Sequence, residues 1–139
     1  MTRPLVLAVP IGLLLAACSR PPGAGGAAAA VRCDAAGAAN AVFIEIAYAP
    51  DGMPVATPDT CSVARGTDVE WRGPDGTPQA FEIRFKRGNA MPASPEGRVH
   101  SAAAGARQVA RGRADAAPGR YDYAIRSGSK ERDPAIIIR

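Results

Sequence analysis

Hydrophobic and polar side chains alternate through much of the chain from residue 42 onward, and this pattern predicts a series of short β-strands. In residues 42–48, Val42, Ile44 and Ile46 fall on one face of the expected strand. The same period of two recurs in residues 68–72, where Val69 and Trp71 share a face between charged neighbours. Further strands are expected at residues 61–64, 81–86, 108–114, 121–126 and 134–139.

Turn-forming sequences separate these segments. Asp51-Gly52, Pro74-Asp75-Gly76 and Pro118-Gly119 each lie between two expected strands. About seven short strands, with no convincing helix between them, predict an all-β fold, an antiparallel two-sheet Greek-key sandwich. Residues 87–105 are rich in Gly, Ala, Pro and Ser and carry little periodic signal, so we expect a long loop that is functional or disordered.

A short hydrophobic segment precedes the expected domain. Arg3 supplies a positive start, residues 5–14 form an apolar core, and Leu-Ala-Ala-Cys at 15–18 places small residues before a cysteine. The apolar run is shorter than the roughly 20 residues of a transmembrane helix, which favours a signal peptide over a retained anchor. An ordinary secretory peptide cut at an Ala-x-Ala pattern is the alternative.

The sequence at 15–18 resembles the lipobox of bacterial lipoproteins. The resemblance implies that a diacylglycerol is joined to the sulfur of Cys18, that residues 1–17 are removed, and that the new amino terminus is acylated. Several acyl chains hold a protein at a bilayer more firmly than one, which anchors only reversibly. Ser19 follows the cysteine where inner-membrane lipoproteins of well-studied Gram-negative bacteria have Asp. We therefore expect anchoring in the cell envelope, at the outer membrane facing the periplasm rather than at the inner membrane.

Residues 19–30 read SRPPGAGGAAAA and contain no large apolar side chain. Their density of Gly and Pro predicts a flexible tether, which together with the lipidated cysteine occupies residues 18–30. The alternative, an alanine-rich helix that runs on through Ala41, is weakened by several glycines. Residues 31–139 then suffice for one β-sandwich domain and are too few for two.

The charge balance argues against nucleic acid as a partner. Loss of Arg3 with the signal peptide reduces seventeen Lys and Arg to sixteen, against thirteen Asp and Glu, so the balance is +3. Nucleic-acid binding requires a denser basic face with stacking aromatic side chains. Several arginines do gather in one part of the sequence, namely Arg98, Arg107, Arg111 and Arg113. They form either solvated strand and loop faces or a contact with anionic head groups, lipopolysaccharide or a cell-wall polymer.

Two segments resemble cupredoxins. GTDVEW at 66–71, followed by Asp75-Gly76 and Phe81, is similar to the G-x-x-V-x-W strand that precedes a ligand loop in that family. PGRYDY at 118–123 is similar to the P-G-x-Y-x-Y sequence that precedes the copper cysteine. The resemblance covers residues 42–139 and implies a cupredoxin-like sandwich.

The copper ligands of that family are not present at the matching positions. Gln79 stands where the family has its first histidine, eight residues after Trp71, and Ile125 stands where it has the thiolate. Residues 126–130 supply neither His nor Met. Because a type 1 centre requires two imidazoles and a thiolate, we expect no bound cofactor and a fold that is used without its metal.

A copper site of another kind is a second possibility. Met53, Met91 and His100 all lie in segments expected to be loops, and soft thioethers suit Cu(I). The alternative is that these scattered Met and His residues have no metal role and simply occupy surface or core positions.

Cys33 and Cys61 form an even pair once Cys18 carries lipid. An oxidising envelope compartment favours a structural disulfide between them. A redox-active or metal-binding pair is the alternative, although the C-x-x-C spacing typical of such pairs is missing.

No catalytic signature occurs in the sequence, which has no G-x-S-x-G, H-E-x-x-H or P-loop motif. Our leading hypothesis is a non-catalytic, lipid-anchored envelope module with a binding or structural role. Its loops, especially residues 87–105, would contact an envelope protein, an anionic polymer or a small ligand. A periplasmic copper-binding or redox accessory protein with a non-type-1 site is the alternative. An enzyme of unfamiliar design is a third hypothesis, which a convergent cluster of ionisable side chains would favour.

Overall fold

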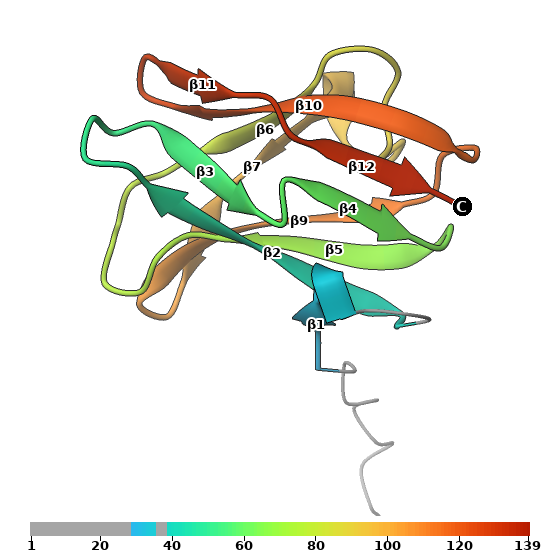
Figure 1. Cartoon of the computed structure of the whole chain (residues 1–139), viewed down its shortest axis with the longest axis horizontal. Helices are drawn as coiled ribbons and strands as arrows, with labels where there is room; N and C mark the ends of the chain where they lie inside the picture. The colour runs from blue at the N-terminus through green and yellow to red at the C-terminus, as the bar shows by residue number, and fades with distance from the viewer. Residues whose placement is uncertain (1–28, 36–38) are drawn as a thin grey trace, which may run out of the picture.

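The computed structural model describes residues 29–35 and 39–139 as two β-sheets packed face to face (Figure 1). The predicted signal peptide, Cys18 and most of the predicted tether lie outside the described residues. The all-β two-sheet sandwich expected from the sequence is confirmed. Within the described part of the chain, no helix is long and apolar enough to cross a membrane.

Each sheet has six strands. The first sheet consists of β1 (Val31–Arg32), β2 (Ala41–Tyr48), β3 (Pro54–Thr57), β5 (Thr67–Arg72), β8 (Ala102–Ala104) and β9 (Arg107–Ala114). The second sheet consists of β4 (Thr60–Val63), β6 (Glu82–Phe85), β7 (Arg98–His100), β10 (Gly119–Ser127), β11 (Lys130–Arg132) and β12 (Ala135–Ile138). Two short 3₁₀ helices, η1 (Cys33–Ala35) and η2 (Pro95–Gly97), accompany them.

The alternating segments form the strands that pack on the core. In the parallel pair β2 and β5, Val42 lies opposite Val69 and Ile44 lies opposite Trp71. All four side chains are completely buried, so this register places the apolar face of both strands inward. The charged residues between them remain on the outer face of the sheet.

The number and direction of the strands differ from the sequence-based expectation. The described residues form twelve strands where about seven were expected. The sheets are mixed, because β1–β2, β2–β5 and β4–β12 pair in parallel. Between β2 and β5 the chain adds β3 to the first sheet and then crosses to form β4 in the second. β2 and β5 are therefore not joined by a hairpin and run in the same direction.

Residues 87–105 are not one long loop, as their composition suggested. They contain η2, β7 and β8, and β7 pairs with β6 while β8 pairs with β9. Alanine and glycine give little strand signal, but backbone pairing with stronger strands supplies the order that the side chains do not.

A hydrogen-bonded aromatic pair joins the two sheets at the core. The indole Nε1 of Trp71 on β5 donates to the hydroxyl of Tyr123 on β10 at 3.1 Å. Their rings meet edge to face with centroids 5.6 Å apart, and both side chains are completely buried. The single buried indole donor is thus satisfied from the opposite sheet.

A disulfide joins the start of the domain to the second sheet. Cys33 in η1 is bonded to Cys61 in β4, 28 positions further along the sequence, and their Cα atoms are 5.8 Å apart. Cys33 is 7% exposed and Cys61 is fully buried. The predicted bridge is confirmed.

We predict that Cys33→Ala lowers the free energy of unfolding by about 3 to 4 kcal/mol under oxidising conditions, because the open unfolded chain gains entropy. Thermal unfolding of oxidised and reduced protein measures this difference. Cys18→Ser is the matched control and should leave the melting temperature unchanged. Equal melting of the oxidised and reduced wild type would contradict a stabilising role for the bridge.

We predict that Tyr123→Phe lowers stability by about 1 to 3 kcal/mol at neutral pH, because the buried Trp71 N–H loses its acceptor. Burial raises the pKa of Tyr123, although the Trp71 hydrogen bond acts in the opposite direction. The unfolded phenol ionises near its ordinary pKa of 10.0 while the folded one stays neutral, so wild-type stability should fall as pH rises above that value.

Urea unfolding at neutral and alkaline pH tests both effects. In Tyr123→Phe, the free energy of unfolding should not show the part of the decrease at alkaline pH that Tyr123 causes in the wild type. Tyr121→Phe is the control, because the Tyr121 hydroxyl donates only to the exposed carbonyl of Ala117 at 2.8 Å. Equal losses in the two variants would show that the buried contact has no special energetic role.

Candidate functional site

A small polar cluster occupies the corner where the cupredoxin resemblance would place a metal. The Gln79 amide Nε2 donates to the Ser127 hydroxyl at 2.5 Å. Ser127 is 3% exposed, and its Oγ donates to the carbonyl of Ala80 at 3.3 Å and lies 3.5 Å from the Tyr48 hydroxyl. Residues from β2, β10 and the segment before β6 thus meet through their own hydrogen bonds.

The residues at this corner do not fit a type 1 copper ion. Ile125, at the thiolate position, is completely buried and offers only an aliphatic side chain. Gln79, at the first histidine position, holds Ser127 instead. An amide and a hydroxyl do not replace the imidazole and thiolate ligands that such a centre requires.

The alternative copper candidates lie in three different environments. Met91 is fully buried, and its sulfur lies so close to Gly112 of β9 that a β-carbon at that position would stand 3.0 Å away. Met53 lies in the turn before β3, where its N–H donates to Asp51 Oδ1 at 3.0 Å. His100 is an exposed residue of β7. Among residues 29–35 and 39–139, no three His, Cys, Asp or Glu side chains gather as a metal site.

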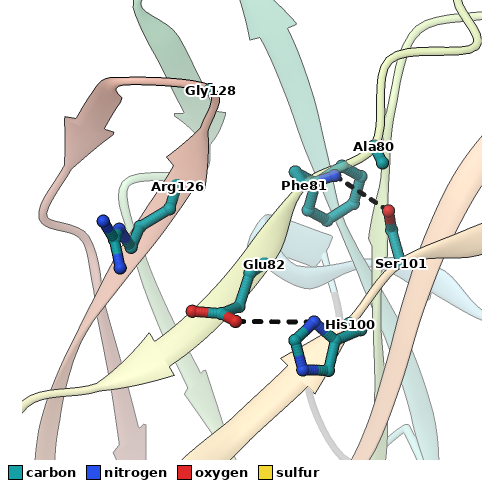
Figure 2. A pocket seen from close by; sticks show the side chains of 7 residues that line it. All are labelled: Ala80, Phe81, Glu82, His100, Ser101, Arg126 and Gly128. Carbon is teal, nitrogen blue, oxygen red and sulfur yellow. Dashed lines mark hydrogen bonds and ion pairs between the residues drawn. The ribbon is translucent and has the colours of Figure 1, made fainter.

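An open hollow of about 310 Å³ on the second sheet contains the single histidine (Figure 2). His100 Nδ1 lies 3.4 Å from the Oε2 of Glu82, whose side chain is 19% exposed. Ser101 follows His100 in sequence, but its Oγ accepts the Phe81 N–H at 2.9 Å and is 3.1 Å from Gln108 Oε1. The hydroxyl of Ser101 is therefore engaged in structural hydrogen bonds and is not poised beside the imidazole as a nucleophile.

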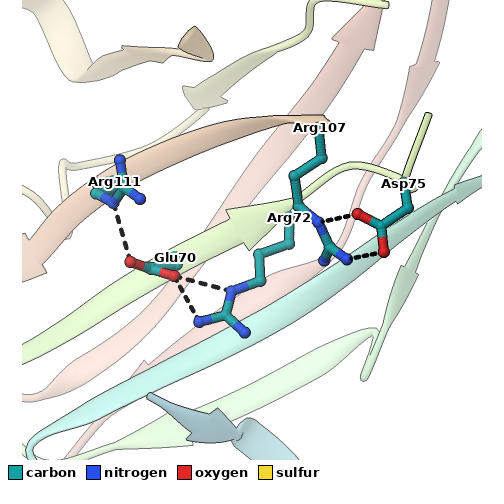
Figure 3. A network of polar contacts seen from close by, with 5 residues as sticks. All are labelled: Glu70, Arg72, Asp75, Arg107 and Arg111. Carbon is teal, nitrogen blue, oxygen red and sulfur yellow. Dashed lines mark hydrogen bonds and ion pairs between the residues drawn. The ribbon is translucent and has the colours of Figure 1, made fainter. Parts of the chain in front are cut away.

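The outer face of the first sheet carries a network of paired charges (Figure 3). Glu70 on β5 accepts hydrogen bonds from Arg111 Nε at 2.9 Å and from Arg72 Nε at 2.8 Å. The Arg72 guanidinium also stacks on Phe43 of β2, with its carbon 4.1 Å from the ring centroid. Nearby, Arg107 Nε donates to Asp75 Oδ1 at 2.8 Å.

Two opposing influences set the ionisation of Glu70. Partial burial alone would raise its pKa, but the hydrogen bonds and charges of Arg111 and Arg72 together lower it below the ordinary value of 4.5. Glu70 is therefore a stably ionised partner for two guanidinium groups rather than a candidate general acid.

The four arginines that are close in sequence separate in the fold. Arg107, Arg111 and Arg113 lie on β9, whereas Arg98 lies on β7 in the other sheet. Each β9 arginine has an acidic partner, which for Arg113 is Asp115 at 3.4 Å. These three arginines thus form a paired, solvated strand face.

The fold also creates an arginine pair that the sequence did not indicate. Arg84 on β6 lies directly opposite Arg98 on the antiparallel strand β7. Because β7 falls within the segment expected to be a loop, no sequence pattern placed these two residues together. Only a correct register for β6 and β7 would have revealed the pair.

No protein-family model matches the chain, and no curated protein matches it. The assignment of residue roles therefore depends on the geometry of this chain alone.

We predict that Arg111→Gln raises the pKa of Glu70, because one hydrogen-bond donor is lost while burial persists. In the wild type, the lowered pKa contributes stability that is present above about pH 4.5 and is lost as pH falls through the lowered value. This contribution should shrink in the variant. NMR titration of the Glu70 carboxyl carbon, together with acid unfolding, measures both changes.

Arg113→Gln serves as the control, since Arg113 pairs with Asp115 and Asp68 and not with Glu70. It should leave the Glu70 titration unchanged. A Glu70 pKa that is equally insensitive to Arg111→Gln would mean that the pairing on β9 does not control this carboxylate.

Proposed function

We propose that this chain is a lipid-anchored protein of the bacterial cell envelope whose β-sandwich is a non-catalytic binding module. The observation that carries the proposal is the Cys33–Cys61 disulfide, because such bonds form and persist in oxidising compartments outside the cytosol. This environment agrees with export through the lipobox-like sequence at 15–18.

The place where the chain enters the domain also supports anchoring at the N-terminus. Cys18 precedes Cys33 by fifteen positions, and β1 and η1 are the first described elements after the predicted tether. The two-residue strand β1 is a slight attachment by itself. The disulfide adds a covalent connection from this entry point to β4.

The environment of the polar side chains supports binding rather than catalysis. Gln79 and Ser127 are hydrogen-bonded to each other, and the Ser101 hydroxyl is hydrogen-bonded to a backbone N–H and to Gln108. The Glu82–His100 pair sits in an open hollow without an adjacent free hydroxyl in the described structure. A surface of charged strands suits contact with a partner in the periplasm, and Ser19 is in keeping with anchoring at the outer membrane.

We predict that Cys18→Ser abolishes labelling of the chain by radioactive palmitate and leaves either a soluble protein or an uncleaved precursor. The thioether to diacylglycerol requires the Cys18 sulfur, which serine lacks. Metabolic labelling and membrane fractionation in a Gram-negative host measure both outcomes. Cys33→Ala is the matched control and should keep its label.

Retention of label by Cys18→Ser would falsify the anchoring proposal. Ser19→Asp provides a second test of location. It should move the labelled protein from the outer toward the inner membrane fraction, without changing the amount of label.

A further inference from the structure

Arg84 and Arg98 form a pair of like charges on the outer face of the second sheet. The residues beside them in β6 and β7, Ile83 and Val99, are buried, so the two arginines point outward. Like charges directly opposite each other in an antiparallel ladder are destabilising. Within the described residues, no carboxylate oxygen lies within 4.0 Å of the Arg84 guanidinium. The carboxylate beside Arg98 belongs to Glu96, at 3.8 Å and on a side chain that is 78% exposed.

Lys86 and Arg126, the basic side chains next to this pair, each have carboxylate partners. Lys86 lies 2.6 Å from Asp133 and 3.3 Å from Glu131, and Arg126 lies 3.3 Å from Glu131. His100 lies beside Glu82. Among the described residues of β6 and β7, Arg84 therefore has no carboxylate partner within 4.0 Å, and Arg98 has only the exposed carboxylate of Glu96.

A hollow next to Arg84 provides space for an oxyanion. Ala124 of β10 is opposite Arg84 and is 1% exposed, so its methyl group forms the floor. The hollow has a volume of about 200 Å³ and is lined by Arg84, Phe85, Lys86, Ala124 and Glu131. Glu131 forms ion pairs with Lys86 and Arg126, and its negative charge repels an anion from its side of the hollow. An entering anion is thereby directed toward Arg84, and Arg98 lies opposite Arg84 on the neighbouring strand β7, outside the hollow.

The chemistry of the pair suits an anionic ligand that repeats its carboxylate groups. Each guanidinium presents planar donors that match a carboxylate, often through two parallel hydrogen bonds. A single exposed ion pair contributes little, about 0 to 1 kcal/mol in typical cases. A polymer that repeats its anionic group compensates through multivalency, because binding at one group raises the effective concentration of the next.

The position of the pair favours a ligand other than the anchoring bilayer. The strands of the second sheet run in the order β4-β12-β10-β6-β7. β4 carries Cys61, which is bonded to Cys33 at the entry of the chain, and β7 with Arg98 is the last strand at the other end of this order. A domain anchored at its N-terminus thus carries the arginine pair on the edge remote from its attachment.

We propose that Arg84 and Arg98 bind carboxylate groups of an anionic cell-wall polymer, with peptidoglycan as the ligand class. The choice of polymer rests on the proposed envelope location, whereas the oxyanion site rests on the arginine pair. A protein anchored to the membrane and bound to the wall in this way links the two layers.

The test uses the lipidated full-length protein in non-ionic detergent, sedimented with purified peptidoglycan sacculi. Wild type should cosediment at low salt and be released as salt rises. The double variant Arg84→Gln/Arg98→Gln should bind at least about tenfold more weakly. Sacculi whose carboxyl groups have been capped with methylamine should not retain the wild type.

Arg107→Gln/Arg113→Gln is the matched control, because it removes the same charge from paired positions of β9, and it should keep nearly wild-type binding. Equal weakening of both double variants would overturn the proposal in favour of net charge alone. Undiminished binding of the Arg84/Arg98 variant, or undiminished binding to capped sacculi, would overturn it as well.

Two further measurements keep the outcomes separate. The Arg84/Arg98 variant should melt no lower than wild type, because a repulsion is removed, so weak binding cannot be ascribed to unfolding. NMR signals of the Arg84 and Arg98 side chains should not respond when phosphatidylglycerol is added to the micelles, and a response would assign the site to membrane head groups instead. If the wild type carried no palmitate label but still bound sacculi, the anchor alone would be refuted. If it carried the label but did not bind sacculi, this site alone would be refuted.

Discussion

The hydrogen bond between Trp71 and Tyr123 is the contact on which the sandwich depends, because it lies where the two sheets meet. Both side chains are fully buried, and each comes from a different sheet. A buried indole N–H without an acceptor would cost about 1 to 3 kcal/mol, a substantial part of the stability of a small domain. The contact therefore requires β5 and β10 to face each other in one alignment, and the neighbouring apolar side chains pack around that alignment.

Alternation in sequence predicted the strands that pack on this core. In β2, β5 and β10 the side chains that face inward must be apolar, so the fold leaves a period of two in the sequence. Short peripheral strands leave no such trace. β11 consists of exposed charged residues, and β3 begins with Pro54 on an edge of its sheet, so both are defined by backbone pairing with stronger neighbours.

The candidate site was less predictable than the fold. That residues such as Gln79 and Ile125 are poor copper ligands can be judged from the sequence, since that judgement needs only their side-chain chemistry. The arginine pair required the register of β6 and β7, which no local pattern encodes. Proximity in sequence was also misleading for Arg98 and Arg111, because the chain changes sheets between them. The lipid anchor remains an inference from residues 1–18, which lie outside the described structure.

The arginine side chains on the two outer faces of the sandwich differ in how their charges are paired. On the first sheet, Glu70 accepts hydrogen bonds from Arg72 and Arg111, and the charges are balanced within the protein. On the second sheet, Arg84 has no carboxylate within 4.0 Å among the described residues, and the opposite Arg98 has only the exposed Glu96 at 3.8 Å. One fold thus combines a face whose arginines are paired with carboxylates of the protein and a face whose two opposed arginines have little such pairing.

The Cys33–Cys61 bond has a mechanical consequence for a protein held by its N-terminus. Tension that arrives through the tether would first separate β1 from β2, a contact of only two residues. The covalent bond follows β1 directly, so it stops the separation from spreading past Cys33 and passes the force to β4, which lies beside β12 in the other sheet. Both sheets then share the load, so the domain resists peeling from its own end when the membrane and a distant partner move apart.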